Sequence, residues 1–154
     1  MADFIVRKAV KKEFPEIRRL IHEVHINPTG LDWRHFLVAK TPENILLGCG
    51  QVKTHFDGSL ELASIAVNPY ARGQGVARAI IQELLAQEAR RPLYLMCRAQ
   101  LETLYTKFGF HSIGLSDMPP YFQRIWRLVS ILRSRAPTDD RLIVMKLGQE
   151  RDDQ

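Results

Sequence analysis

Cysteine is scarce in this sequence, and long apolar runs are missing from it. The two cysteines among its 154 residues, Cys49 and Cys97, both lie inside apolar segments, as buried free thiols do. Two such cysteines provide neither a dense disulfide framework nor a zinc-binding spacing. No apolar run approaches the roughly 18 residues that cross a bilayer, and the first residues lack the apolar core of a signal peptide. We therefore expect a reducing, cytoplasmic location, no metal site and no membrane partner.

Clusters of basic charge are also missing, although the net charge is +5. A mildly basic chain accommodates acidic ligands such as nucleotides and CoA-type cofactors. The basic residues are spread along the chain, without the arm or the aromatic-interleaved stripe of nucleic-acid binders, so no nucleic-acid partner is expected. Length and ordinary composition predict a single domain over residues 1–148, followed by a polar tail at residues 149–154.

Residues 60–88 have the most distinctive pattern in the chain. The aliphatic segment Leu60–Val67 is ended by Asn68-Pro69, and Arg72-Gly73-Gln74-Gly75 then precedes apolar residues at helical spacing. Glycine lets a backbone approach a ligand without a Cβ in the way. The start of a helix presents free N–H groups and the positive end of the helix dipole. The stretch therefore predicts a strand, an anion-binding turn and a helix, with a phosphate or pyrophosphate as the ligand.

Further strands and helices are predicted on both sides of this stretch. Strands are expected at residues 4–10, 35–40, 45–56, 93–97, 110–113 and 141–147, and helices at 11–25, 100–108 and 119–135. Residues 31–36 form either a short helix or a direct lead into the next strand. Asp57-Gly58 predicts a hairpin, whereas the helix between residues 67 and 93 predicts a parallel pair. Gly48 and Gly50 weaken their strand, or indicate a bulge or a close approach of another backbone.

Two motifs, taken in this order, resemble the GNAT superfamily, which transfers acetyl groups from acetyl-CoA to amines. Arg72-Gly73-Gln74-Gly75-Val76-Ala77 fits the Arg/Gln-x-x-Gly-x-Gly/Ala signature between a strand and a helix, and Leu104-Tyr105-Thr106-Lys107-Phe108-Gly109-Phe110 looks like the family's Leu-Tyr-x-x-x-Gly-Phe segment. By element order the resemblance covers nearly the whole chain. It implies an α+β fold with a mixed, mostly antiparallel sheet of about seven strands, a splayed parallel pair and helices on both faces.

The resemblance also implies how acetyl-CoA binds. Backbone N–H groups of one segment would hold the CoA pyrophosphate, namely those of Arg72, Gly73, Gln74, Gly75, Val76, Ala77 and Arg78. The pantetheine arm would pair with the backbone of the preceding strand, at Ile65, Ala66 and Val67. A main-chain N–H there would polarise the thioester carbonyl as its oxyanion develops. Gln100 stands at or near the place where the family often has an asparagine that contacts the cofactor.

Two residues are expected to carry the chemistry. Tyr105 aligns with the family's frequent general acid, which protonates the departing thiolate, although a packed aromatic side chain is the other interpretation. Glu61 lies where many members place a glutamate that takes a proton from the acceptor ammonium, and an outward-facing carboxylate is its alternative. His55 is a second candidate base, since a tight turn would bring it close to Glu61. The resemblance implies direct attack in a ternary complex, which is the family norm, and no paired histidine is evident that would favour an acetyl-cysteine at Cys97.

The predicted function is therefore transfer of the acetyl group from acetyl-CoA to an amine acceptor. A non-catalytic acyl-CoA-binding or regulatory domain of the same fold is the alternative. An NADP-binding oxidoreductase fits less well, because Arg78 stands where the dinucleotide fingerprint has its third glycine. A small amine, an amino acid, a peptide N-terminus and a protein lysine all remain open as acceptors. The aromatic residues at 33, 121, 122 and 126 are expected either to line the acceptor site, to pack in the core or to form a dimer contact. A homodimer is therefore left open.

Overall fold

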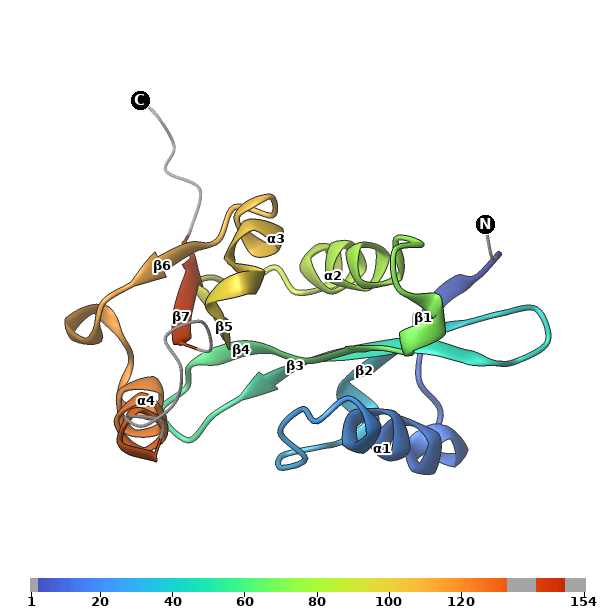
Figure 1. The fold of residues 1–154 in the computed structure, drawn as a ribbon, viewed down its shortest axis with the longest axis horizontal. Helices are drawn as coiled ribbons and strands as arrows, with labels where there is room; N and C mark the ends of the chain where they lie inside the picture. The colour runs from blue at the N-terminus through green and yellow to red at the C-terminus, as the bar shows by residue number, and fades with distance from the viewer. Residues whose placement is uncertain (1–2, 133–140, 149–154) are drawn as a thin grey trace. The chain divides into compact units, whose positions relative to one another are not determined.

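The computed structural model describes residues 3–132 and 141–148, which form seven β-strands and four α-helices (Figure 1). The strands are β1 Ile5–Lys8, β2 Phe36–Lys40, β3 Leu46–Thr54, β4 Leu60–Val67, β5 Leu93–Arg98, β6 His111–Ile113 and β7 Leu142–Leu147. The helices are α1 Phe14–Glu23, α2 Val76–Gln87, α3 Glu102–Thr106 and α4 Pro120–Leu132. Short 3₁₀ helices are η1 Lys11–Glu13, η2 Trp33–His35, η3 Pro69–Ala71, η4 Ala99–Leu101 and η5 Leu115–Asp117.

The strands are hydrogen-bonded in the order β1-β2-β3-β4-β5-β7-β6. Strands β1 and β2, β2 and β3, β5 and β7, and β6 and β7 pair antiparallel, whereas β4 and β5 pair parallel. The parallel ladder has two residue pairs, Leu60 with Leu93 and Glu61 with Tyr94, whereas β5 pairs with β7 through six. The mixed, mostly antiparallel sheet with a short, splayed parallel pair is thereby confirmed.

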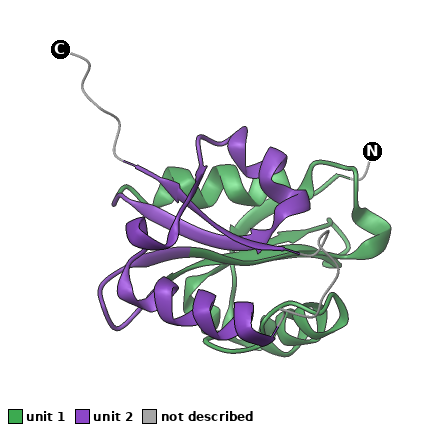
Figure 2. Ribbon diagram, turned by 60° about the vertical axis from the view of Figure 1, so that its left-hand side comes forward, with its two compact units in different colours: residues 1–53, 62–89 green, residues 54–61, 90–154 purple. Residues whose placement is uncertain are grey.

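The chain divides into two compact units (Figure 2). Unit 1 comprises residues 1–53 and 62–89, and unit 2 comprises residues 54–61 and 90–154. The single domain over residues 1–148 stays a prediction. The polar tail, the end of the helix expected at 119–135 and the breaker at 136–140 lie outside the described residues. Within the part of the chain that the structure describes, no helix is both long and apolar enough to span a membrane.

In unit 1, α1 and α2 lie on opposite faces of the strands (Figure 1). The buried face of α1 repeats at helical spacing, and Ile17, Leu20 and Ile21 pack in one core cluster with residues of β2 and β3. Pro15 in the first turn is tolerated because the N–H that it lacks would have no partner there. The helix predicted at 11–25 begins as η1, and the short helix at 31–36 is confirmed as η2.

Two glycines of β3 let α2 approach the sheet closely. A Cβ at Gly48 would lie 2.8 Å from Val76 Cγ1, and one at Gly50 would lie 2.5 Å from Ile65 Cδ1 and 2.9 Å from Ile80 Cγ2. The β2–β3 register also shifts opposite Gly48. The alternatives of a bulge and of a close backbone are both observed at Gly48, because a Cβ there would also lie 2.9 Å from the backbone oxygen of Ala66. The absence of these two side chains allows the start of α2 to pack against β3.

In unit 2, α3 and α4 lie on opposite faces of the strands (Figure 1). Phe122 of α4 is fully buried, and it packs in a core cluster with Met118, Tyr94 and Val144. Helix α3 ends before Gly109, whose φ of +96° suits the glycine expected after a helix C-terminus. Helices thus cover both faces of the strands in each unit, as predicted.

Candidate active site

In unit 1, two glycines with open space beside them precede the N-terminus of α2. Gly73 and Gly75 adopt left-handed backbone with φ of +77° and +82°, which side chains disfavour. A Cβ at either position would meet no atom of the described residues within 4 Å. Left-handed backbone therefore requires these glycines, and the space in front of them is free. Gly75 is the N-cap residue, so the helix begins directly behind this space.

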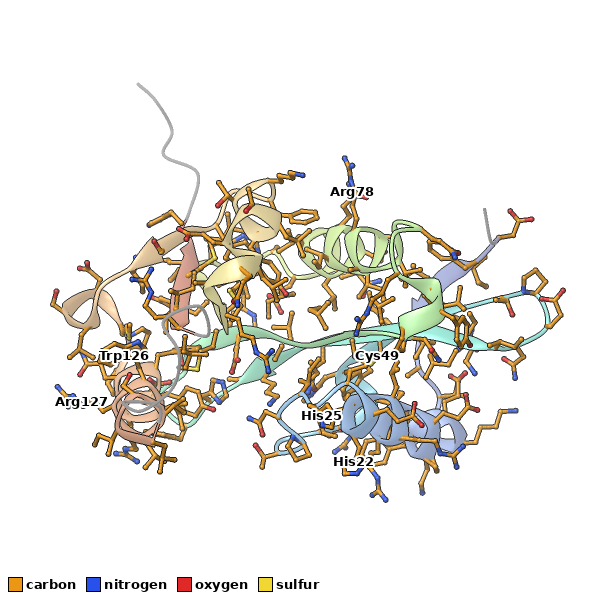
Figure 3. All side chains as sticks on the ribbon, viewed as in Figure 1. His22, His25, Cys49, Arg78, Trp126 and Arg127 are labelled. Atoms are coloured by element: carbon orange, nitrogen blue, oxygen red, sulfur yellow. The ribbon has the colours of Figure 1, made fainter. Side chains whose placement is uncertain are left out.

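The first backbone N–H groups of α2 are available to a ligand. No side chain of the described residues caps this N-terminus. Ala79 N–H donates to Gly75 C=O at 3.0 Å, so the N–H groups of Val76, Ala77 and Arg78 precede the first helical bond. The segment 68–78 has no acidic residue, and the side chain of Arg78 points away from the sheet (Figure 3). Free N–H groups, the helix dipole and local positive charge together favour an anion.

Strand β4 leads toward residues 72–78, the open segment at the start of α2 that is termed the cradle, and is irregular at Ser64. Its φ of +58° is rare for a residue with a side chain. Ser64 Oγ accepts a hydrogen bond from Gln51 Nε2 at 2.9 Å, and Ser64 C=O lies 3.7 Å from Cys49 Sγ. Ile65, Ala66 and Val67 are the last three residues of β4, beyond this irregularity.

In unit 2, the turn between β3 and β4 brings His55 and Glu61 together. His55 Nε2 and Glu61 Oε1 are 2.7 Å apart, with side chains 11% and 14% exposed. The turn is closed by the backbone N–H of His55 on Ser59 C=O at 2.9 Å. The predicted proximity of the two side chains is confirmed. The pair is nearly buried and joined by a short hydrogen bond, which is an arrangement suited to proton transfer.

Helix α4 holds this turn in a way that the sequence does not reveal. The ring of Tyr121 stacks on His55 with centroids 3.4 Å apart and planes at 11°. Asp57 Oδ2 accepts from the backbone N–H of Tyr121 at 2.9 Å, and its Oδ1 accepts from Ser59. Burial acts to raise the pKa of Asp57, but these hydrogen bonds outweigh it and lower the pKa. Asp57 thereby caps the first turn of α4 from a distant part of the chain.

Tyr105 is packed within unit 2, on α3. It is 7% exposed, and its ring contacts Phe110 edge-on at 6.2 Å. Burial, with a smaller contribution from Cys97, raises the pKa of Tyr105 well above its ordinary value, so the hydroxyl keeps its proton at neutral pH. Burial also raises the pKa of Cys97 to about 11, so its thiol is not an activated nucleophile.

The two expected catalytic residues have different neighbours. Glu61 lies against His55, and it helps burial to raise the pKa of Tyr121. Tyr105 instead lies beside Phe110 and close to Cys97. Gln100 lies in η4, just before α3. No cluster of three or more histidine, cysteine, aspartate or glutamate side chains suited to a metal occurs among the described residues.

A model of the acetyltransferase (GNAT) domain matches residues 32–112, which include both the cradle and Tyr105. The chain belongs to the GNAT acetyltransferase family. The resemblance drawn from the sequence is thereby confirmed. The match also decides against the NADP-binding oxidoreductase.

Solved structures share the GNAT fold. N-acetylglutamate synthase from Neisseria gonorrhoeae, complexed with coenzyme A and L-arginine, is similar with a TM-score of 0.73 and 17% identity, over 98% of this chain and 34% of that one. A Mycobacterium tuberculosis protein in complex with CoA is similar with a TM-score of 0.70 and 21% identity, over 94% and 98% of the two chains. At these identities the likeness shows the fold alone.

A short stretch is also similar to a curated sequence. An uncharacterised protein of Mycobacterium leprae (strain TN) is 42% identical over 65 residues, which is 40% of this chain. The chain spans 18% of that protein and 34% of the N. gonorrhoeae enzyme. Activities of these longer proteins are therefore not transferred to this chain by similarity.

Proposed function

We propose that this protein transfers the acetyl group of acetyl-CoA to an amine acceptor by direct attack in a ternary complex. The cradle at the start of α2 carries this proposal. Its left-handed glycines, its free space and its uncapped N–H groups fit a pyrophosphate. Because the chain belongs to the GNAT family, we infer that this pyrophosphate is that of CoA.

The cofactor contacts predicted from the sequence are part of this proposal. Backbone groups of the cradle would bind the pyrophosphate, at Arg72, Gly73, Gln74, Gly75, Val76, Ala77 and Arg78. Backbone groups at the end of β4 would pair with the pantetheine arm, at Ile65, Ala66 and Val67. Gln100 is proposed as a further contact. Acetyl-CoA supplies the acyl group as a thioester, whose carbonyl becomes more negative during attack and is stabilised by a main-chain N–H.

Glu61 is proposed as the general base, with His55 beside it. An acceptor ammonium has no lone pair with which to attack, so it must first lose a proton. The carboxylate of Glu61 would take this proton directly or through a water molecule. The 2.7 Å contact with His55 supports this role, because a hydrogen bond fixes the orientation of the carboxylate.

Tyr105 is proposed as the general acid that protonates the departing CoA thiolate. The Tyr105 hydroxyl is protonated at neutral pH and can donate that proton to the thiolate, although burial, by raising its pKa, makes it a weaker acid. Its burial equally fits a packing role, so its substitution is a direct test. The alternative function is a non-catalytic acyl-CoA-binding domain. Such a domain would bind CoA at the cradle but would not transfer the acetyl group.

Thermal unfolding with and without CoA tests the cofactor first. We expect millimolar CoA to raise the Tm, and an unchanged Tm would contradict the whole proposal. Thiol release from acetyl-CoA is then followed with a panel of amines, peptides with free N-termini and lysine peptides. Amino acids come first in the panel because one structural neighbour is an N-acetylglutamate synthase. Binding of CoA without turnover of any acceptor would favour the regulatory alternative.

Two variants separate the proposed acid from the proposed base. Tyr105→Phe should lower kcat by about 100-fold at every pH while CoA still binds. Glu61→Gln should lower kcat at neutral pH by a similar factor, and should recover at high pH as the acceptor loses its proton to solvent. The same pH profile for both variants would show that the roles are wrongly assigned.

A further inference from the structure

Unit 1 contains an open cavity of about 470 Å³ that is separate from the cradle at the start of α2. It is formed between the start of α1 and the segment around η2, and its lining residues are Lys11, Phe14, Leu31, Asp32, Trp33 and Arg34. This volume is within the range of small-molecule sites, which extends from about 300 to 1,000 Å³. We propose that the cavity binds a small organic anion with an aromatic or branched apolar body and one carboxylate group.

The charge of the lining favours an anion. Asp32, the acidic residue of the lining, accepts from Arg34 Nε at 3.0 Å, Arg34 Nη2 at 2.8 Å and the Arg34 backbone N–H at 3.0 Å. The Arg34 guanidinium lowers the pKa of Asp32 to about 2, so the carboxylate stays charged and paired. One acidic and two basic side chains leave a surplus of one positive charge, supplied by Lys11. A ligand carboxylate compensates this surplus.

Glu13, the acidic residue of η1, does not cancel the charge of Lys11. Glu13 of η1 is 3% exposed, and both its oxygens accept from Arg7 at 2.8 Å. Lys40 Nζ adds a further ion pair to Glu13 at 3.1 Å. These cations hold the pKa of Glu13 at about 2. Glu13 is therefore fully engaged by Arg7 and Lys40, and its charge does not compensate that of Lys11.

The remaining lining specifies the body of the ligand. Phe14, Leu31 and Trp33 are partly buried and present two aromatic rings and one aliphatic side chain. Arg18 lies over the Phe14 ring at 5.3 Å and adds to the positive field at this face of α1. Aromatic surface next to a cation binds a flat apolar body that carries a negative end. The surplus positive charge of the lining disfavours a cationic amine.

The cavity and the α2 cradle lie at opposite ends of the strands of unit 1. The cavity adjoins the start of β2, since η2 ends at Phe36 and Ala9 N–H donates to Phe36 C=O at 3.0 Å. The cradle follows β4, where Asn68 N–H donates to Leu47 C=O at 2.8 Å, near the end of β2. Strand β2 separates these ends by roughly 13 Å. The ligand is thus distinct from the CoA pyrophosphate, and its binding does not depend on the proposed function.

The indole N–H signals of the protein test this proposal without CoA. The chain has two tryptophans, Trp33 and Trp126. In one ¹H–¹⁵N spectrum, the indole signal of Trp33 therefore reports binding in the cavity, and that of Trp126 serves as an internal control. Trp33→Phe assigns the signals. Phenylacetate is titrated at physiological salt, and phenethylamine is the matched cation. We expect a saturable shift of the Trp33 signal with phenylacetate, little change at Trp126, and no saturation with phenethylamine.

Charge variants then locate the anion. Lys11→Glu should weaken phenylacetate binding by at least about tenfold, because it replaces an attraction by a repulsion. Lys12→Glu changes the neighbouring exposed lysine of η1, which does not line the cavity, and should alter affinity by less than about twofold at a Debye length near 8 Å. Lys11→Met serves if the charge reversal disturbs folding. Equal effects at both lysines, equal binding of phenethylamine, or no saturable Trp33 shift would overturn the proposal.

Discussion

Gly75 offers a sharp test of the cradle, because the chain contains a matched glycine elsewhere. Gly75 and Gly58 have φ of +82° and +83°, and a Cβ at either would meet nothing within 4 Å. Alanine at either position pays the same cost for left-handed backbone, about 1–2 kcal/mol. Without ligand, both variants should lose this much stability, which lowers the Tm by about 2–4 °C for each kcal/mol.

The two variants should differ only when CoA is added. Gly75 caps α2, and its added methyl group would occupy the free space proposed for the pyrophosphate. We expect at least about a tenfold loss of CoA affinity for Gly75→Ala, which corresponds to about 1.4 kcal/mol. Gly58 lies in the turn between β3 and β4, so Gly58→Ala should bind CoA within about twofold of the parent.

Calorimetric titration with CoA and urea unfolding without it measure the two effects separately. If Gly75→Ala binds CoA as tightly as Gly58→Ala does, the cradle does not hold the pyrophosphate. If both variants lose affinity, the effect comes from stability and not from the site. Gly73→Ala, with φ of +77° and equally free space, is the second variant if Gly75→Ala fails to fold.

Two further predictions concern stability. Glu13→Gln should cost about 3 kcal/mol at pH 7, because the pKa of Glu13 is held at about 2 instead of 4.5. Since this pKa is lowered, the contribution is complete above about pH 4.5 and is lost toward pH 2, so urea titrations of parent and variant should converge in acid; half-exposed Glu16→Gln should cost less than about 1 kcal/mol. Gly50→Ala, with a Cβ 2.5 Å from Ile65 Cδ1, should cost about 1–3 kcal/mol in the same titrations. Gly114→Ala, where a Cβ meets nothing within 4 Å, should be near neutral, and an equal loss at both positions would contradict the packing role of Gly50.

The predicted stretch at residues 60–88 illustrates what local signals can establish. Strand β4 spans Leu60–Val67 as predicted, and α2 begins at Val76, directly after the glycines. Proline, glycine and helical periodicity act on neighbouring residues, so their effect can be deduced without knowledge of the fold. The same holds for His55 and Glu61, because the Asp57-Gly58 turn brings together residues six positions apart.

Contacts between residues far apart in the sequence could not be predicted from such local patterns. Asp57 bonds to a backbone N–H that lies 64 positions later, and Tyr121 covers His55 over a similar separation. The burial of Lys40 against Glu13 likewise depends on how β2 and η1 pack. Each of these residues has an ordinary local context, and its partner is selected by the fold.

The amino-acid sequence by itself determined the GNAT family, the order of the elements and the position of the glycine turn before α2. These follow from backbone preferences and residue spacing, which act over a few residues. Only the tertiary structure decided which groups support that chemistry. It placed α4 on the turn that carries Glu61, left the first N–H groups of α2 without a capping side chain, and formed the cavity beside Lys11. The reason is that burial, pairing and free space are properties of assembled elements, which a single segment does not possess.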